Sequence, residues 1–373
     1  MQCHDTKWPD TGEYLEEFIA KAEQLHIPLA GSLELTHRCN LNCVHCYLGQ
    51  QAKRQVLRDR EMSAARIHTL IDEITEAGCL NLLITGGEPL LREDFPEIYR
   101  HAKGNGLLVT VFTNGTIIGE KTIELFCDLP PVEVEISVYG ATEHVYESIT
   151  SVHGSYKKCL LGIRGLLENG VRVNLKTILM TINRHEFTDM ENMAKELGVR
   201  FRFDAAISPR MDGDNSPLGL RVPPEEAIEK EMSGAGKVES WKTFFEKFKD
   251  RTLGSGLYGC GAGLTAFHID PFGHILPCMM ALDMRYDISE AGFKEGWDNI
   301  MHRIRDKKTA ADFACRGCVK INLCGYCPGF FRLENGLEDV PSEYICRMGG
   351  LRYEYIHDHA MKGDHGGQPE KVS

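Results

Sequence analysis

The chain has 373 residues, 42% hydrophobic and 26% charged, a composition typical of a globular protein large enough for two domains. Its net charge of -12 argues against nucleic acid as the main partner, because binding to phosphates needs clustered Lys and Arg. No apolar run reaches the roughly 18 residues of a membrane span, and the N-terminus lacks the basic-then-apolar layout of a signal peptide. We therefore expect a cytoplasmic protein with no membrane or nucleic-acid partner.

The first predicted elements alternate between strand and helix. Residues 1–30 predict one helix, around Glu13–Gln24. From residue 31 to residue 210, short β-rich runs alternate with stretches whose apolar residues recur at helical spacing. In the clearest helical stretch, Ser63 can cap the start and Gly78 can stop the end. The predicted strands are Ser32–Thr36, Leu80–Thr85, Leu107–Thr113, Val132–Val138, Val171–Thr181 and Arg200–Ile207.

This alternation predicts an α/β fold with a parallel sheet and helices on its outside. Six units favour a partial (β/α)6 barrel of the TIM type, in which functional residues lie at the C-terminal ends of the strands. After the barrel, Pro and Gly residues in 211–257 predict a linker with helical stretches at Glu225–Met232 and Trp241–Phe248. A small cysteine-rich domain at 258–350 and a polar tail at 351–373, expected to be flexible, follow.

The fourteen cysteines are a high number for a cytoplasmic chain, where disulfides rarely persist. Three lie within residues 39–46, and seven more lie between Cys260 and Cys346. Clustered thiols in a reducing compartment indicate metal or iron–sulfur ligation. The four isolated cysteines are expected to behave as small hydrophobic residues; they are Cys3, Cys79, Cys127 and Cys159.

The first cysteine group directly follows the first predicted strand, with spacings of Cys39-x3-Cys43-x2-Cys46. Three thiolates can hold three irons of a cubane cluster and leave the fourth iron open to a group that is not protein. A zinc site is a poor fit, because structural zinc takes four ligands and no fourth one is nearby.

Small and polar residues end the next three predicted strands. Gly86-Gly87-Glu88 ends the second strand, where the two glycines let the backbone approach a ligand closely. Asn114 ends the third strand and Ser137 the fourth. We expect all of them to lie with the three cysteines at one edge of the barrel.

Together these motifs resemble the radical SAM superfamily, over roughly residues 30–210. In that family the open iron is chelated by the amino and carboxylate groups of S-adenosylmethionine (AdoMet). The resemblance implies that Glu88 accepts a hydrogen bond from the AdoMet ammonium and that the Ser137 hydroxyl reaches its ribose. The position of His45 is usually aromatic, and an imidazole can still pack on adenine. The implied chemistry is reductive cleavage of AdoMet to a 5′-deoxyadenosyl radical, which abstracts a hydrogen atom from the substrate.

The second cysteine group resembles the SPASM extension, which carries two auxiliary four-iron clusters. The resemblance implies one cluster on Cys315, Cys318, Cys324 and Cys346, and another on Cys260, Cys278 and Cys327. The second of these lacks a fourth cysteine, so either another group completes it or one iron stays open. A zinc ribbon that uses Cys315, Cys318, Cys324 and Cys327 remains an alternative.

Enzymes with this extension mostly modify peptides or proteins. Our leading hypothesis is a maturase of a ribosomally made peptide, which installs a crosslink or another oxidation and is reduced by a donor such as flavodoxin or ferredoxin. The first alternative is a tetrapyrrole-modifying enzyme of the haem pathway, in which Arg200, Arg202 and Arg210 could meet propionates. The second is a non-catalytic iron–sulfur electron-transfer protein. No general acid or base is assigned from the sequence.

Overall fold

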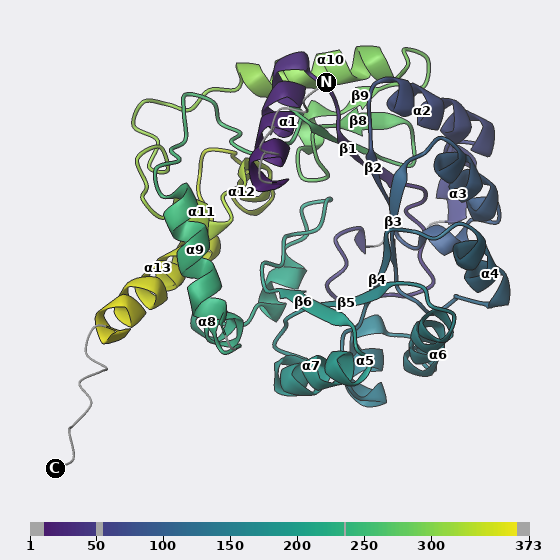
Figure 1. Cartoon of the computed structure of the whole chain (residues 1–373), viewed down its shortest axis with the longest axis horizontal. Helices are drawn as coiled ribbons and strands as arrows, with labels where there is room; N and C mark the ends of the chain where they lie inside the picture. Colours follow the sequence, from purple (N-terminus) through teal and green to yellow (C-terminus); the bar gives the residue numbers. More distant parts are fainter. Residues whose placement is uncertain (1–10, 50–54, 235, 364–373) are drawn as a thin grey trace, which may run out of the picture.

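The computed structural model describes residues 11–49, 55–234 and 236–363. Among these residues, nine strands form one sheet in the order β6-β5-β4-β3-β2-β1-β7-β8-β9, which curves with helices along its outer face (Figure 1). The strands are β1 (Ala30–Glu34), β2 (Asn81–Thr85), β3 (Leu108–Thr113), β4 (Glu133–Ser137), β5 (Val173–Ile178), β6 (Arg200–Asp204), β7 (Ala266–Ile269), β8 (His274–Leu276) and β9 (Tyr286–Asp287).

The described helices alternate with the strands of the barrel, and others precede and follow it. The α-helices are α1 (Thr11–Leu25), α2 (Ala64–Glu76), α3 (Phe95–Gly104), α4 (Glu120–Asp128), α5 (Glu143–Thr150), α6 (Ser155–Glu168), α7 (Phe187–Glu196), α8 (Pro224–Met232), α9 (Lys237–Phe248), α10 (Phe293–Asp306), α11 (Ile321–Cys324), α12 (Pro328–Asn335) and α13 (Glu343–Gly363). Short 3-10 turns are η2 (Gln55–Arg60), η3 (Pro89–Leu91), η4 (Arg184–Glu186), η5 (Ser216–Leu220) and η6 (Leu282–Met284).

The six predicted strands are confirmed as β1 to β6, and all of their pairings are parallel. On each strand alternate side chains point to opposite faces. Apolar side chains such as Val111, Ile136 and Leu175 are fully or almost fully buried beneath the outer helices. The residues between them therefore point to the inner, concave face of the barrel. The α/β partial barrel predicted from the sequence is the observed fold.

The predicted ends of α2 are also confirmed. The Ser63 hydroxyl accepts a hydrogen bond from the backbone N–H of Arg66 at 3.3 Å, as an N-cap does. The chain leaves the helix at Ala77, and Gly78 then adopts φ +97°, which only glycine takes at little cost.

The sheet does not end with the barrel, because β7 lies parallel to β1 on its other side. The ring of Phe267 occupies the space over Gly31, where an added Cβ would lie 2.2 Å from it. Phe267 packs on Phe293 and Trp297, and the Trp297 indole N–H donates to the His26 carbonyl at 2.8 Å. The expected boundary between residues 257 and 258 therefore separates segments that share one sheet.

The predicted helical stretches of the linker are confirmed as α8 and α9, but the prediction of a flexible tail from residue 351 is wrong. Helix α13 continues to Gly363, and only residues 364–373 of that tail lie outside the described part of the chain. The reason is packing: Met348 and Leu351 of α13 are buried against Ile228 and Met232 of α8. Figure 1 shows α13 as the long yellow helix beside α8, α9 and α11.

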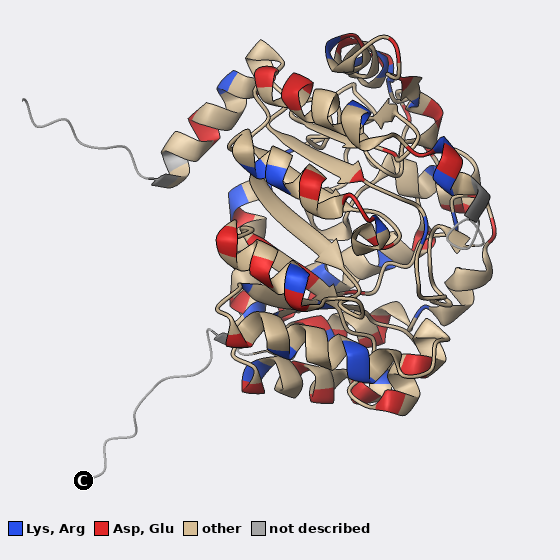
Figure 2. Ribbon diagram, turned by 90° about the vertical axis from the view of Figure 1, so that its right-hand side faces the viewer, with Lys and Arg blue, Asp and Glu red and all other residues tan. Residues whose placement is uncertain are grey.

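Charges of both signs are mixed along the outer helices of the face shown in Figure 2. Among the described residues, no helix is both long and apolar enough to cross a bilayer.

Candidate active site

The first three cysteines lie in the loop that follows β1, with their thiols close enough to interact electrostatically. Burial raises the pKa of the Cys39 thiol to about 12, and the nearby Cys46 thiolate raises it further. Burial also raises the pKa of Cys43, with contributions from Cys39 and Cys46. Three partly buried thiols that disfavour one another's ionisation form a donor set that a bound iron–sulfur cluster would stabilise, since iron binds thiolates.

The cysteine loop is supported by neighbouring elements. The N–H groups of Asn42 and Val44 donate to the carbonyls of Thr150 and Ile149 at the end of α5, at 2.9 and 3.0 Å. From the end of β3, the Asn114 amide donates to Asn40 Oδ1 at 2.9 Å and lies 3.7 Å from the Cys39 sulfur. The predicted site residue Asn114 is therefore in contact with the first cysteine.

Gly86 and Gly87 bring the end of β2 against the backbone that leads into Cys39. The Gly87 N–H donates to the Thr36 carbonyl at 2.7 Å, and the Glu88 N–H donates to the Arg38 carbonyl at 2.9 Å. A Cβ at Gly86 would lie 2.3 Å from the Thr36 oxygen, and one at Gly87 would lie 2.4 Å from the Arg38 oxygen. The close approach that these glycines permit is, in this structure, to the chain's own backbone.

The Glu88 carboxylate is fully buried and joins the segment after β2 to the end of β3. It accepts hydrogen bonds from the N–H of Leu90 at 3.2 Å, the hydroxyl of Thr113 at 2.8 Å and the N–H of Asn114 at 2.7 Å. Burial raises its pKa to about 7, although the hydrogen bonds from Asn114, Thr113 and Leu90 act in the opposite direction. Donors of the chain itself thus occupy three acceptor positions of the carboxylate. The sequence did not predict these hydrogen bonds.

Of two further predicted residues, Ser137 ends β4 and His45 lies in the cysteine loop. Ser137 is half-buried on the concave face, two residues before Tyr139. The His45 ring packs edge-on against Tyr139 with ring centroids 4.7 Å apart. Burial lowers the pKa of His45 to about 4, so its imidazole is neutral at pH 7. A neutral imidazole held on an aromatic ring is compatible with the aromatic role expected at this position.

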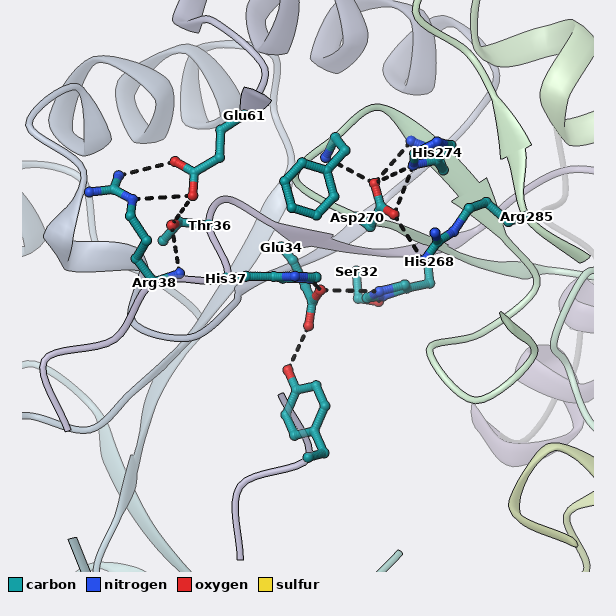
Figure 3. Close-up of polar contacts among 12 residues, drawn as sticks. Ser32, Glu34, Thr36, His37, Arg38, Glu61, His268, Asp270, His274 and Arg285 are labelled. Atoms are coloured by element: carbon teal, nitrogen blue, oxygen red, sulfur yellow. Dashed lines mark hydrogen bonds and ion pairs between the residues drawn. The ribbon is translucent and has the colours of Figure 1, made fainter. Parts of the chain in front are cut away.

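A buried network beneath the loop was missed by the sequence reasoning (Figure 3). Glu34, 1% exposed on β1, accepts hydrogen bonds from the Tyr47 phenol at 2.6 Å and from His37 Nε2 at 2.8 Å. Beside it, His268 of β7 hydrogen-bonds Ser32 at 2.7 Å. Burial raises the pKa of Glu34, but His268 and His37 outweigh it and hold the pKa below its usual range. Tyr47 directly follows Cys46, so the network fixes one end of the cysteine loop.

A second set of contacts holds the other end of the loop. Arg38 forms an ion pair with Glu61 at 3.0 Å, and the Thr36 hydroxyl also donates to Glu61. In the β7–β8 hairpin, Asp270 accepts from His274 Nδ1 at 2.9 Å, as Figure 3 shows. The hairpin residue Phe272 packs edge-on against His37 at 5.0 Å. Apart from the Asp270–His274 pair, these contacts join residues from different parts of the chain, so no local sequence pattern marks them.

Four of the later cysteines form one group. Burial raises the pKa of Cys324 to about 12, and the Cys346, Cys315 and Cys318 thiolates raise it further. Helix α13 brings Cys346 to this group by crossing α11 at Gly349, where an added Cβ would lie 2.4 Å from the Cβ of Cys324. This is the set of four predicted for one auxiliary cluster.

The other three later cysteines form a separate group. Burial raises the pKa of Cys278 to about 11, with contributions from Cys327 and Cys260. Cys327 caps α12, where its sulfur accepts from the N–H of Phe330 at 3.4 Å. Tyr258 and Cys278 pack against the same buried cluster, and the Tyr258 phenol donates to Glu338 at 2.7 Å. By these electrostatic contacts, the described cysteines near the active site and in the C-terminal region fall into groups of three, three and four.

The arginines considered for propionate binding are paired with carboxylates. Arg200 contacts Glu133 at 2.6 Å, Arg202 contacts Glu135, and Arg210 contacts Asp214 at 2.6 Å. Their charges are therefore offset within the chain.

A partial parallel barrel that carries three convergent cysteines after its first strand defines a class of iron–sulfur enzyme scaffold. The profile of the radical SAM superfamily matches residues 33–197. The AdoMet-dependent heme synthase of Methanosarcina barkeri is 26% identical over 315 residues, 79% of this chain and 89% of that protein. The mycofactocin maturase MftC of Mycobacterium tuberculosis is 27% identical over 312 residues, 80% of this chain and 78% of that protein.

The fold matches that of SuiB from Streptococcus suis in complex with the precursor peptide SuiA. The TM-score is 0.66 at 16% identity, with 93% of this chain and 83% of that chain covered. Residues 33–197 form a domain of the radical SAM superfamily, and the chain is a radical SAM enzyme. This finding removes the alternative of a non-catalytic electron-transfer protein.

Proposed function

We propose that the chain is a peptide maturase, which uses AdoMet and three iron–sulfur clusters to oxidise a ribosomally made peptide. The observation that carries the proposal is the grouping of the described cysteines into sets of three, three and four. Two auxiliary iron–sulfur sites besides the AdoMet site suit a net oxidation, because a substrate that is oxidised must pass an electron to an acceptor. Relatives that are named as peptide-modifying enzymes, and a peptide-bound structure of the same fold, support a peptide substrate.

In this proposal Cys39, Cys43 and Cys46 hold the cluster that binds AdoMet. When bound, that cluster supplies the electron that cleaves AdoMet and yields the radical that abstracts hydrogen. Asn114 fixes the position of Cys39, and Ser137 faces the ribose from the end of β4. The part of the chain around Glu88 holds the ends of β2 and β3 together and so shapes the AdoMet pocket.

The C-terminal cysteines hold two auxiliary clusters. Cys315, Cys318, Cys324 and Cys346 supply the four ligands of one, and Cys260, Cys278 and Cys327 supply three ligands of the other. A flavodoxin or ferredoxin is the proposed electron donor. We propose that the chain divides by function into residues 1–30, 31–210, 211–257, 258–350 and 351–373. The sheet contains strands from both sides of the boundary at residue 257, and α13 crosses the boundary at residue 350.

The first test is the iron, sulfide and zinc content of protein purified without oxygen. Three cubane clusters predict about 12 irons per chain, from four irons each. About four irons and one zinc would instead indicate a structural zinc site in the four-cysteine group. The second test incubates the reduced enzyme with AdoMet and candidate precursor peptides. A loss of about two hydrogens in mass supports the proposal, and unchanged peptides beside active AdoMet cleavage contradict it.

A tetrapyrrole is the second candidate substrate, and the similarity to an AdoMet-dependent heme synthase favours it. The pairing of Arg200 and Arg202 with glutamates argues the other way, since propionates need unpaired cations. The same assay with an iron porphyrin that carries propionates separates the two. Loss of carbon dioxide from the porphyrin, with peptides unchanged, would select the tetrapyrrole.

A further inference from the structure

A lysine lies inside the barrel wall, where neither the sequence motifs nor the proposed cofactor sites use it. Lys176 of β5 is 22% exposed and projects to the concave face, since its neighbours Leu175 and Thr177 are buried on the other side. It is the register partner of Ser137 on β4. Lys176 therefore lies beside the residue proposed to face the AdoMet ribose.

The groups around the Lys176 ammonium come from three neighbouring strands. Its nitrogen lies 3.0 Å from the centre of the Phe112 ring on β3 and 3.6 Å from Glu135 Oε2 on β4. Arg202 on β6 contacts the same Glu135 oxygen. Farther along the same face, Glu133 pairs with Arg200, and Asp204 accepts from the backbone of Ala206.

This arrangement differs from an ordinary structural ion pair. Glu135 already has Arg202 as a charge partner, and its 3.6 Å distance to Lys176 is longer than a typical hydrogen bond. The lysine is thus a second cation beside one carboxylate, with its ammonium against an aromatic ring. Burial lowers the pKa of Lys176 to about 7; Glu135 raises it and Arg202 lowers it further. Near neutral pH a large fraction of the amine is unprotonated and can accept a proton.

We propose that Lys176 accepts the proton that a peptide substrate releases when it is oxidised, an inference that rests on the proposed peptide maturase function. Abstraction of hydrogen from a carbon next to an N–H or O–H leaves a carbon radical. That radical becomes a C=N or C=O group by losing one proton and one electron. The proton goes from the substrate nitrogen or oxygen to Lys176 Nζ, and the electron goes to an oxidised acceptor of the iron–sulfur class. The substrate carbon at this site therefore carries an amide, amine or hydroxyl neighbour.

The first experiment tests the amine directly in the cluster-loaded enzyme. Trace labelling with acetic anhydride at a series of pH values, read by peptide mass mapping, reports the pH at which each amine becomes reactive. The midpoint for Lys176 is expected near pH 7, well below the ordinary lysine value of 10.5. Glu135→Gln is expected to lower that midpoint, because it removes the negative charge. A midpoint near 10.5 would overturn the proposal.

The second experiment separates proton transfer from AdoMet binding. Lys176→Met and Lys176→Arg are compared with Lys195→Met, a change at an exposed residue of α7. Without substrate, all three variants are expected to cleave AdoMet at rates within about two-fold of the parent enzyme. The rates should depend on the AdoMet concentration in the same way. With a peptide that the parent enzyme modifies, both Lys176 variants should form about 100-fold less product per 5′-deoxyadenosine, in line with the loss of a general base.

Other outcomes assign Lys176 a different role. A ten-fold rise in the AdoMet concentration needed by Lys176→Met would make it an AdoMet-binding residue, contrary to the proposal. A lower melting temperature with unchanged product yield would make it structural. If the parent enzyme modifies no peptide at all, the proposed function fails, whereas the labelling midpoint of Lys176 still stands as measured.

Discussion

The Glu88 carboxylate accepts a hydrogen bond from the Asn114 N–H at 2.7 Å and so joins the ends of β2 and β3. Asn114 in turn contacts the Cys39 sulfur, so that Glu88 is linked to the proposed cluster through Asn114 and then Cys39. Glu88 of the Gly-Gly-Glu motif thus supports the proposed AdoMet pocket by holding the strand end that contacts Cys39.

Glu88→Gln is predicted to destabilise the fold by about 1–3 kcal/mol, the cost of leaving a buried donor unpaired. All three partners of Glu88 are donors, and the glutamine NH₂ group would face at least one of them. Urea denaturation measures the change. Asp128→Asn, at an exposed residue that ends α4, is the control.

The pH dependence of stability tests the same residue. Burial raises the pKa of Glu88 from 4.5 to about 7, so between these values the unfolded chain loses the proton first. Its contribution to the free energy of unfolding is therefore full below pH 4.5 and declines as the pH rises through 7. The Gln variant lacks this decline. Parallel stability–pH curves for the two proteins over pH 5 to 7.5 would contradict the assignment.

Gly87→Ala is predicted to abolish the first iron–sulfur site while leaving the auxiliary sites loaded. The added Cβ would lie 2.4 Å from the Arg38 carbonyl oxygen and would displace the backbone that enters the loop. Iron content should fall from about 12 to about 8 per chain. Gly104→Ala, which meets nothing within 4 Å, should keep the full content. Equal iron loss in both variants would point to general instability.

Single cysteine replacements should remove the auxiliary clusters one at a time. Cys278→Ala is predicted to lose about four irons from the three-cysteine group, and Cys318→Ala about four from the four-cysteine group. Cys127→Ala, at an exposed isolated thiol, should lose none. Iron analysis with electron paramagnetic resonance distinguishes the two losses. Loss of both clusters from either variant would mean that the groups fold only together.

Arg221→Met is predicted to destabilise the protein by about 3 kcal/mol, because it leaves the largely buried Glu334 without its partner. Arg221 pairs with Glu334 at 2.7 Å and lies 4.6 Å from the Tyr344 ring, which joins the linker to the C-terminal region. Thermal denaturation measures the effect. The double variant Arg221→Met with Glu334→Leu should recover part of the loss.

The sequence predicted the parts of this molecule that depend on local pattern. Strands β1 to β6 follow from short β-rich runs, and the cysteine groups follow from spacing. The contact between Ser32 and His268 joins residues 236 positions apart, and no local pattern marks it. The same holds for the lysine at position 176, whose unusual setting depends on Phe112, Glu135 and Arg202 from three other strands. The length of α13 was missed because its composition is polar while its packing partners lie on α8.

The pairing of β1 with β7 also sets an order of events during protein synthesis. β1 is among the first strands made, yet one of its edges has no partner until the ribosome has released residues 266–269. Until then its backbone groups are open to pairing with other chains. His268, which lies beside Glu34 beneath the cysteine loop, arrives at the same late stage. The loop that begins at Cys39 therefore reaches its final support only after residues 266–269 have been made and have paired with β1.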